Sequence, residues 1–272
     1  MLSLSPRSDV PAGRRTLPRE NQYGHTKKLR FLIDEIAAHR ARIGRPVTIL
    51  DFGCGNGSAV SQYLMGDGIH YYGVDIHAPS LDYARTHFGG PAALFYERVP
   101  PDVQFDVIVY ADVLEHVHSP RDLLRTHSRQ LAADGIVIGA VPNGYGPFEI
   151  EQRLDRWLRL SRILTLLSKL GRRARTERPP AAEAALPYNA ESGHVVFFTR
   201  RSLALTIAEG GFEIVRFAHG AFMGASVSGI ALGRSSRLLR WNVRIADRLP
   251  GWAVSTWYFT LRPRGDGAWS TR

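Results

Sequence analysis

The stretch ILDFGCGNGSAV, residues 49–60, decides the fold of this chain. A short apolar run leads into Asp51, and glycine then stands at Gly53, Gly55 and Gly57. Glycine loses more backbone freedom on folding than any other residue, so three glycines in so short a turn need a reason. A strand that ends in such a turn and passes into a helix brings its backbone close to a ligand.

Apolar segments that alternate with helical patterns surround this stretch. The expected strands are 47–52, 70–76, 92–96, 105–112, 135–142, 195–198, 212–217 and 255–263. The expected helices are 26–42, 58–65, 79–88, 119–132, 200–211 and a basic helix near 235–249. This order predicts an α/β fold, a single doubly wound and mostly parallel seven-stranded sheet with a helical lid insertion.

The chain of 272 residues is long enough for one large domain. We expect a disordered lead-in at 1–20 and one domain at 21–272, in which 143–193 forms an insertion over the substrate side. No apolar run is long enough to cross a membrane, and the first residues lack the apolar core of a secretory signal. A single cysteine, Cys54, fits a reducing compartment, so we expect a cytoplasmic protein.

The net charge of +10 is concentrated in two segments. Residues 149–178 carry nine Arg or Lys against four acids, and residues 234–248 carry five Arg against one acid. Such segments suit an anionic substrate, a lipid surface or a nucleic acid, but an ordinary solvated surface explains them as well. In the later segment Arg237, Arg240, Arg244 and Arg248 share one helical face. That face is a candidate for peripheral membrane contact, although a helix that packs its apolar side on the sheet would show the same pattern.

The glycine spacing differs from the dinucleotide fingerprint, which would need glycine at Ser58. Asp51 precedes the glycines, and a carboxylate there suits an ammonium group better than a pyrophosphate. Asp75 ends the second predicted strand, where a carboxylate can bind both hydroxyls of a ribose. A carboxylate suited to an ammonium group, glycines that let a ligand come close to the backbone and a carboxylate suited to a ribose together match the chemistry of S-adenosylmethionine (SAM).

Four motifs in order carry a family resemblance: ILDFGCGNG, YYGVDI, FDVIVYADVLEHV and LAADGIVIGAVPN. The chain resembles the class I SAM-dependent methyltransferases, in the branch of the ubiquinone-biosynthesis O-methyltransferases and bacterial small-molecule and glycan enzymes. The resemblance covers about 47–142 and continues at 193–215. It implies cofactor-binding positions at Asp51, Gly53, Cys54, Gly55, Gly57, Asp75, Ile76, Glu97 and Asp112. Around Glu97 the sequence departs from the family pattern.

Methyl transfer to oxygen also needs a group that removes the acceptor's proton. In the resembled branch, the segment ADVLEHVHSP (111–120) and the return at His194 border the acceptor pocket. His194 and His116 are therefore the candidate catalytic bases. A second reading makes Asp112, Glu115, His116 and His194 ligands of a divalent metal, because a similar pattern occurs in metal-dependent small-RNA 2′-O-methyltransferases. In a third interpretation, Glu115 and His116 only cap the following helix and form hydrogen bonds with the core.

A small hydroxylated metabolite, such as a sugar or a glycolipid, is the acceptor that we expect. It could be anionic or carried on a lipid. We expect SAM as the cofactor, no metal and no nucleic-acid partner. A metal-assisted RNA 2′-O-methyltransferase and a SAM-binding protein without catalysis remain the alternatives.

Overall fold

The computed structural model describes residues 16–159, 186–189, 193–233 and 235–265. Seven strands form one sheet in the described chain: β1 (Val47–Phe52), β2 (Ile69–Val74), β3 (Ala93–Tyr96), β4 (Phe105–Ala111), β5 (Leu131–Pro142), β6 (Phe212–His219) and β7 (Thr256–Pro263). Their order is β3-β2-β1-β4-β5-β7-β6. The first five strands pair in parallel, and β7 runs antiparallel to both β5 and β6. The predicted fold class is confirmed.

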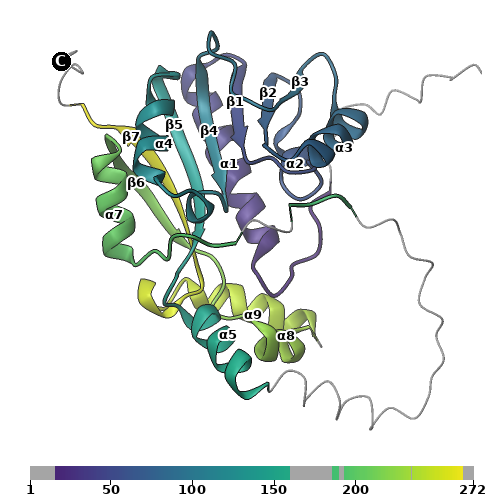
Figure 1. The fold of residues 1–272 in the computed structure, drawn as a ribbon, viewed down its shortest axis with the longest axis vertical. Helices are drawn as coiled ribbons and strands as arrows, with labels where there is room; N and C mark the ends of the chain where they lie inside the picture. The colour runs from purple at the N-terminus through teal and green to yellow at the C-terminus, as the bar shows by residue number, and fades with distance from the viewer. Residues whose placement is uncertain (1–15, 160–185, 190–192, 234, 266–272) are drawn as a thin grey trace, which may run out of the picture.

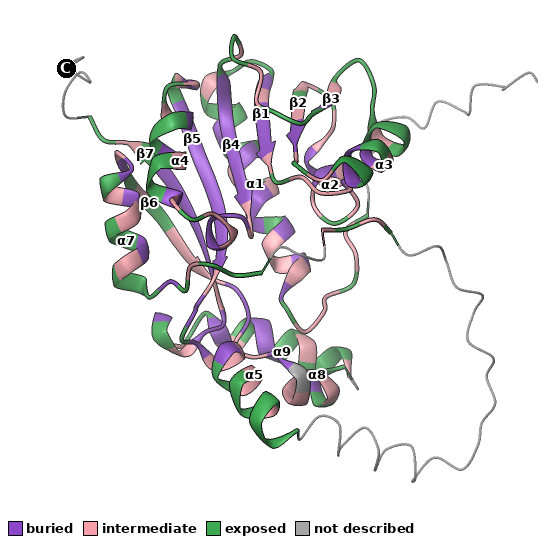
Figure 2. Cartoon of the chain, viewed as in Figure 1, coloured by how far each residue is buried: buried purple, intermediate pink, exposed green. Residues whose placement is uncertain are grey.

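Helices cover both faces of the sheet (Figure 1). On one face, α1 (His25–Ile43), α2 (Ser61–Leu64) and α3 (Ala78–Phe88) contribute to one apolar core. On the other face, α4 (Pro120–Ser128) and α7 (Arg200–Glu209) contribute to a second core. The central strands are buried on both sides (Figure 2), which explains why their sequences are continuously apolar rather than alternating.

A third group of helices lies beyond the carboxyl ends of the parallel strands (Figure 1). It consists of α5 (Pro147–Leu158), α8 (Ser226–Leu232) and α9 (Ser236–Ala246), followed by the short helix η2 (Gly251–Ala253). Glu151 of α5 caps α8, because its carboxylate accepts hydrogen bonds from the backbone of Val227 and Ser228. Helix α8 in turn contacts α9, so the three helices form one layer.

Three expectations need correction. Residues 195–198 form no strand, because the backbone N–H groups of Val195 and Val196 donate to the carbonyl of Glu115 instead of to a neighbouring strand. The helix expected at 58–65 is limited to α2, since the turn around Gly57 extends further than expected. Helix α8 was not expected at all.

The domain limits remain predictions, and much of the insertion lies outside the described residues. Residues 1–15, 160–185 and 190–192 are not described. The described structure begins inside the predicted lead-in, where Glu20 accepts hydrogen bonds from the backbone of Thr26 and Lys27 at the start of α1. No described helix has the combination of length and hydropathy needed to cross a membrane.

Candidate active site at the carboxyl edge of the sheet

The strand order reverses between β1 and β4, and this point locates the candidate site. In an open parallel sheet, ligands bind beyond the carboxyl ends of the two strands at such a switch point. The glycine turn follows β1, Asp75 follows β2, and the segment from Asp112 to His116 follows β4. The topology therefore gathers most of the predicted site residues at one edge.

The glycine turn needs its glycines for two different reasons. Gly53, Gly55 and Gly57 all have positive φ angles, of 79°, 55° and 78°. A Cβ on Gly53 would meet Val113 at 2.7 Å, and one on Gly57 would meet the ring of Phe88 at 2.7 Å. A Cβ on Gly55 would meet nothing within 4 Å. Packing thus excludes a side chain at the two outer positions, while Gly55 presents its backbone to open space where a ligand can approach.

Asp75 lies against this turn. Its carboxylate accepts a hydrogen bond from the backbone N–H of Gly55 at 2.8 Å and another from that of His77 at 2.8 Å. Each carboxylate oxygen has one of these donors and can accept a further hydrogen bond. The next residue, Ile76, exposes 83% of its side chain. A fixed carboxylate beside an exposed apolar surface suits a ribose with its attached base.

Asp51 is buried at the end of β1, beneath the turn. Its side chain is 2% exposed and accepts hydrogen bonds from Ser61 Oγ at 2.8 Å and from the Tyr71 hydroxyl at 2.6 Å. Burial raises the pKa of the Asp51 carboxyl. Asp51 therefore joins β1 to α2 and β2, and any influence on a bound ammonium group passes through other groups.

The other expected cofactor positions have different surroundings. Cys54 is half-buried, and burial raises the pKa of its thiol, so it is a packing residue rather than a nucleophile. Glu97 is exposed after β3. Asp112 adopts a left-handed backbone with φ of 60° and forms an ion pair with Lys28 of α1. The sequence analysis did not anticipate Lys28, because nothing local connects α1 with the end of β4.

Part of the predicted insertion contacts the cofactor side of the site. The carbonyl of Pro187 accepts hydrogen bonds from the Asn56 side chain at 2.9 Å and from Ser80 Oγ at 3.2 Å. Asn56 belongs to the glycine turn, and Ser80 begins α3. Residues 186–189 of the insertion therefore contact the cofactor cradle, and the position of the insertion over the acceptor stays a prediction.

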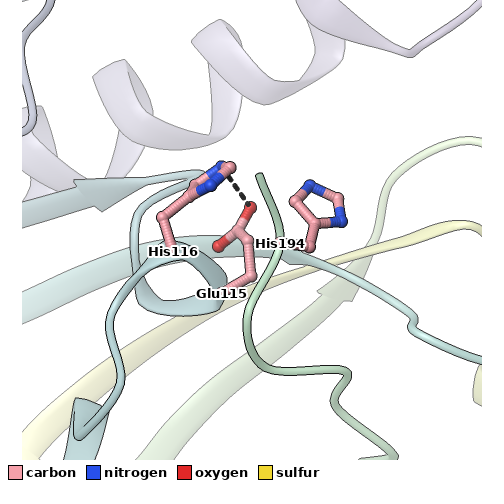
Figure 3. A group of neighbouring side chains, drawn as sticks. All are labelled: Glu115, His116 and His194. Atoms are coloured by element: carbon pink, nitrogen blue, oxygen red, sulfur yellow. Dashed lines mark ion pairs between the residues drawn. The ribbon is translucent and has the colours of Figure 1, made fainter. Parts of the chain in front are cut away.

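Glu115, His116 and His194 form a compact cluster beyond β4 (Figure 3). One ligand atom from each residue lies within 4.8 Å of the others. Glu115 is 1% exposed, and neither of its carboxylate oxygens has a hydrogen-bond partner. Burial, followed by the charge of Asp112, raises the pKa of Glu115 well above its ordinary value. Asp112, the fourth residue of the predicted metal set, is outside this cluster.

The two histidines are held from opposite sides. His116 Nδ1 lies 3.0 Å from the carbonyl of Gly193, and His194 Nδ1 lies 3.6 Å from Glu149 Oε1. Burial, followed by the neighbouring His116, lowers the pKa of His194, so its imidazole is neutral near pH 7. Glu149 is buried in the first turn of α5. The sequence analysis missed Glu149, because an acid at the start of a helix needs no explanation beyond the helix dipole.

The comparison with protein families supports the expected identity. The model of the methyltransferase domain family matches residues 23–216. The chain belongs to this family. The match includes β1 to β5, the first part of β6 and every predicted site residue, and the prediction of a class I SAM-dependent methyltransferase is confirmed.

Curated relatives match only part of the methyltransferase. The ubiquinone biosynthesis O-methyltransferase of Caulobacter sp. (strain K31) is 31% identical over 133 residues, which are 43% of this chain and 51% of the relative. The mRNA cap guanine-N(7) methyltransferase of Schizosaccharomyces pombe (strain 972 / ATCC 24843) is 28% identical over 131 residues, 41% of this chain and 36% of the relative. The chain thus spans about half, or less, of the length of the curated relatives it matches.

Solved structures share the fold at low sequence identity. A SAM-dependent methyltransferase from Clostridium acetobutylicum ATCC 824 has a TM-score of 0.51 with 11% identity, and the match covers 89% of this chain and 92% of that chain. The [4+2]-cyclase SpnF has the same TM-score with 15% identity, covering 94% and 88% of the two chains. Because one of these two proteins is a cyclase, the shared fold does not identify the reaction, which has to be argued from the site.

Proposed function

We propose that this methyltransferase transfers the methyl group of SAM to a hydroxyl oxygen of a small molecule. The observation that carries the proposal is the position of the histidine cluster. His116 and His194 lie at the same edge of the sheet as the glycine turn and Asp75, so a proton acceptor and a cofactor cradle share one crevice. The matching O-methyltransferases support oxygen as the acceptor atom.

The residues of the cradle fit SAM. Gly55 leaves open space, Asp75 offers two carboxylate oxygens to a ribose, and Ile76 offers an exposed apolar surface. When bound, SAM supplies a methyl group on a positively charged sulfur, which becomes a neutral thioether. The chain's own contribution is to align the acceptor with that methyl group and to take up the acceptor's proton.

His194 is the proposed base, with Glu149 as its positioning partner. A carboxylate beside Nδ1 favours the tautomer with the proton on that nitrogen. The other ring nitrogen, Nε2, then has a free lone pair and can accept the hydroxyl proton as the oxygen–methyl bond forms. His116 contacts the His194 ring, with ring centroids 4.9 Å apart, and is the alternative base.

A pocket between the start of α1, α5 and α8 has room for a small molecule. It has a volume of about 280 Å³, and its lining includes Tyr23, which lies just before α1, and Phe148 of α5. The two rings meet edge to face at 6.1 Å. Phe148 directly precedes Glu149 in α5, but no residue of the histidine cluster lines this pocket. The volume suits a single sugar or aromatic ring rather than a nucleic-acid strand.

A divalent metal is the second candidate, and one observation favours it. The buried Glu115 carboxylate has no hydrogen-bond partner and lies 4.0 Å from His116 Nε2, and a carboxylate with two imidazoles is a donor set that divalent transition metals accept. A bound ion would lower the pKa of the acceptor hydroxyl, which is another way to reach the same reaction.

Calorimetry and product analysis test the proposal. The protein should bind SAM and its demethylated product but not NAD, and binding of NAD alone would contradict the assignment. A panel of sugars and phenols is then incubated with SAM, and products are analysed by mass spectrometry and NMR. A methyl group on nitrogen or carbon would overturn the choice of oxygen.

A further inference from the structure

Helix α9 exposes a row of arginines that have no acidic partners. Arg237, Arg240 and Arg244 recur at the helical repeat, and Arg248 follows just after the helix. All four are exposed. In the part of the chain that the structure describes, none of them forms an ion pair. The neighbouring acid, Asp247, is neutralised by Lys27 of α1 at 2.6 Å, so the positive charge of this face is not compensated.

Apolar side chains are exposed beside these arginines. Trp241 is 48% exposed and Leu238 is 43% exposed. The helix packs on the protein through Asn242, Val243 and Ala246 instead. If the apolar side of α9 only packed on the sheet, Leu238 and Trp241 would be buried. Their exposure is therefore not explained by that simpler interpretation.

Helix α5, which like α9 contacts α8, has a second exposed apolar strip. Ile150, Leu154, Trp157 and Leu158 follow the helical repeat and lie on one side of α5. All four are exposed, and Trp157 is 80% exposed. Within the described residues, nothing buries this strip. It belongs to the same layer as α9, beyond the carboxyl edge of the sheet (Figures 1 and 2).

We propose that the outer surface of α5 and α9 binds the headgroup region of an anionic phospholipid bilayer. Arginines attract anionic headgroups, while tryptophan and leucine side chains insert at the boundary between headgroups and acyl chains. A nucleic acid would use the arginines but would leave Leu238 and the apolar strip of α5 in water. This combination of exposed side chains therefore favours lipid.

The surface is directly connected to the active site through α5. Glu149 in its first turn lies beside His194, and Trp157 in its last turn belongs to the exposed strip. A bilayer bound here would be adjacent to the crevice, so an acceptor could enter from the lipid phase. The membrane contact itself does not depend on the proposed methyl transfer.

Vesicle flotation with the full chain tests the proposal. Vesicles of equal parts phosphatidylcholine and phosphatidylglycerol should bind the protein, and vesicles of phosphatidylcholine alone should bind it much less. R240E/R244E should lower binding at least about tenfold, because each arginine near an anionic surface contributes measurably. L238S/W241S should also lower binding, since it removes the inserted apolar groups.

R129E/R264E is the matched control. It reverses two exposed arginines at the opposite edge of the sheet and changes the net charge by the same amount. Circular dichroism melting confirms that each variant is folded. The proposal is overturned if the wild type does not bind the mixed vesicles, or if the control variant loses as much binding as R240E/R244E. It is also overturned if L238S/W241S binds like wild type while a single-stranded RNA binds in a way that depends on Arg240 and Arg244.

Discussion

The imidazole rings of His116 and His194 lie with their centroids 4.9 Å apart and their planes at 65°, although a long insertion separates them in the chain. His116 follows β4, and His194 belongs to the segment that returns before α7. The backbone secures this contact as well, because Val195 and Val196 both donate to the carbonyl of Glu115, at 2.8 and 3.0 Å. Main-chain hydrogen bonds thus hold together the two segments that carry these histidines.

Replacing His194 by alanine should lower kcat by about a hundredfold, because a general base contributes on that order. The affinity for SAM should stay unchanged, since Asp75 and the glycine turn are untouched. Steady-state kinetics and calorimetry measure the two effects. His118→Ala is the control, an exposed histidine in the same segment. If both variants retain full turnover, His194 is not the base.

Glu149→Gln should lower kcat with little change in KM, because the amide no longer selects the tautomer of His194. Glu151→Gln is the matched variant on the same helix. Its carboxylate caps α8, so this change should lower the free energy of unfolding by about 1 kcal/mol and leave kcat intact. Kinetics and urea unfolding of both variants separate the roles, and equal kcat values for the two would remove Glu149 from the mechanism.

Dialysis against EDTA should leave activity intact, because proton removal by a histidine base needs no metal. Elemental analysis of the dialysed protein verifies that no divalent ion remains. Loss of activity that Mg²⁺ or Mn²⁺ restores would instead assign Glu115, His116 and His194 to an ion. Glu115→Gln would then abolish the restoration, since the amide is a poor ligand.

The central sheet was predictable because local sequence and burial agree there. β1 and β4 are mostly apolar, as is usual for strands covered on both faces. The strand predicted at 195–198 was wrong, because a short apolar run is compatible both with a strand and with a loop that forms hydrogen bonds to another loop. The glycine turn and Asp75 were predictable for a different reason, because their chemistry is contained in one short segment.

The remaining site residues depend on contacts between distant segments. Glu149 and Lys28 belong to helices whose sequences give no sign of a ligand, and only tertiary packing brings them to His194 and Asp112. Asp51 is a further case, because the motif alone gives no sign that its carboxylate accepts hydrogen bonds from Ser61 and Tyr71. Spacing along a sequence identifies a motif without fixing where each side chain points.

Gly55→Ala should weaken SAM binding at least about tenfold, because the added methyl group would occupy the open space in which the cofactor approaches the backbone of Gly55. Gly44→Ala is a close control. Gly44 also has a positive φ, of 68°, and a Cβ there also meets nothing within 4 Å. Both variants should lose about 1 kcal/mol of stability from backbone strain. Calorimetry should find weaker SAM binding only for Gly55→Ala, and similar affinities in the two variants would show that Gly55 is needed for its backbone angle alone.

Stability should decrease as the pH falls from 6.5 to 4, and His127 should account for much of the decrease. Burial lowers the pKa of His127 to about 4, and its Nδ1 lies 2.6 Å from the buried Tyr110 hydroxyl. Between these two pH values the unfolded chain takes up a proton that the folded chain refuses, so protonation favours unfolding. The loss is zero above pH 6.5 and reaches at most about 3 kcal/mol near pH 4. Urea unfolding across this range measures the slope. The double variant Y110F/H127F, which removes both polar groups, should flatten it, whereas His87→Phe on the exposed side of α3 should not. A slope unchanged in Y110F/H127F would mean that the other histidines with lowered pKa values, His25, His39 and His194, carry the effect.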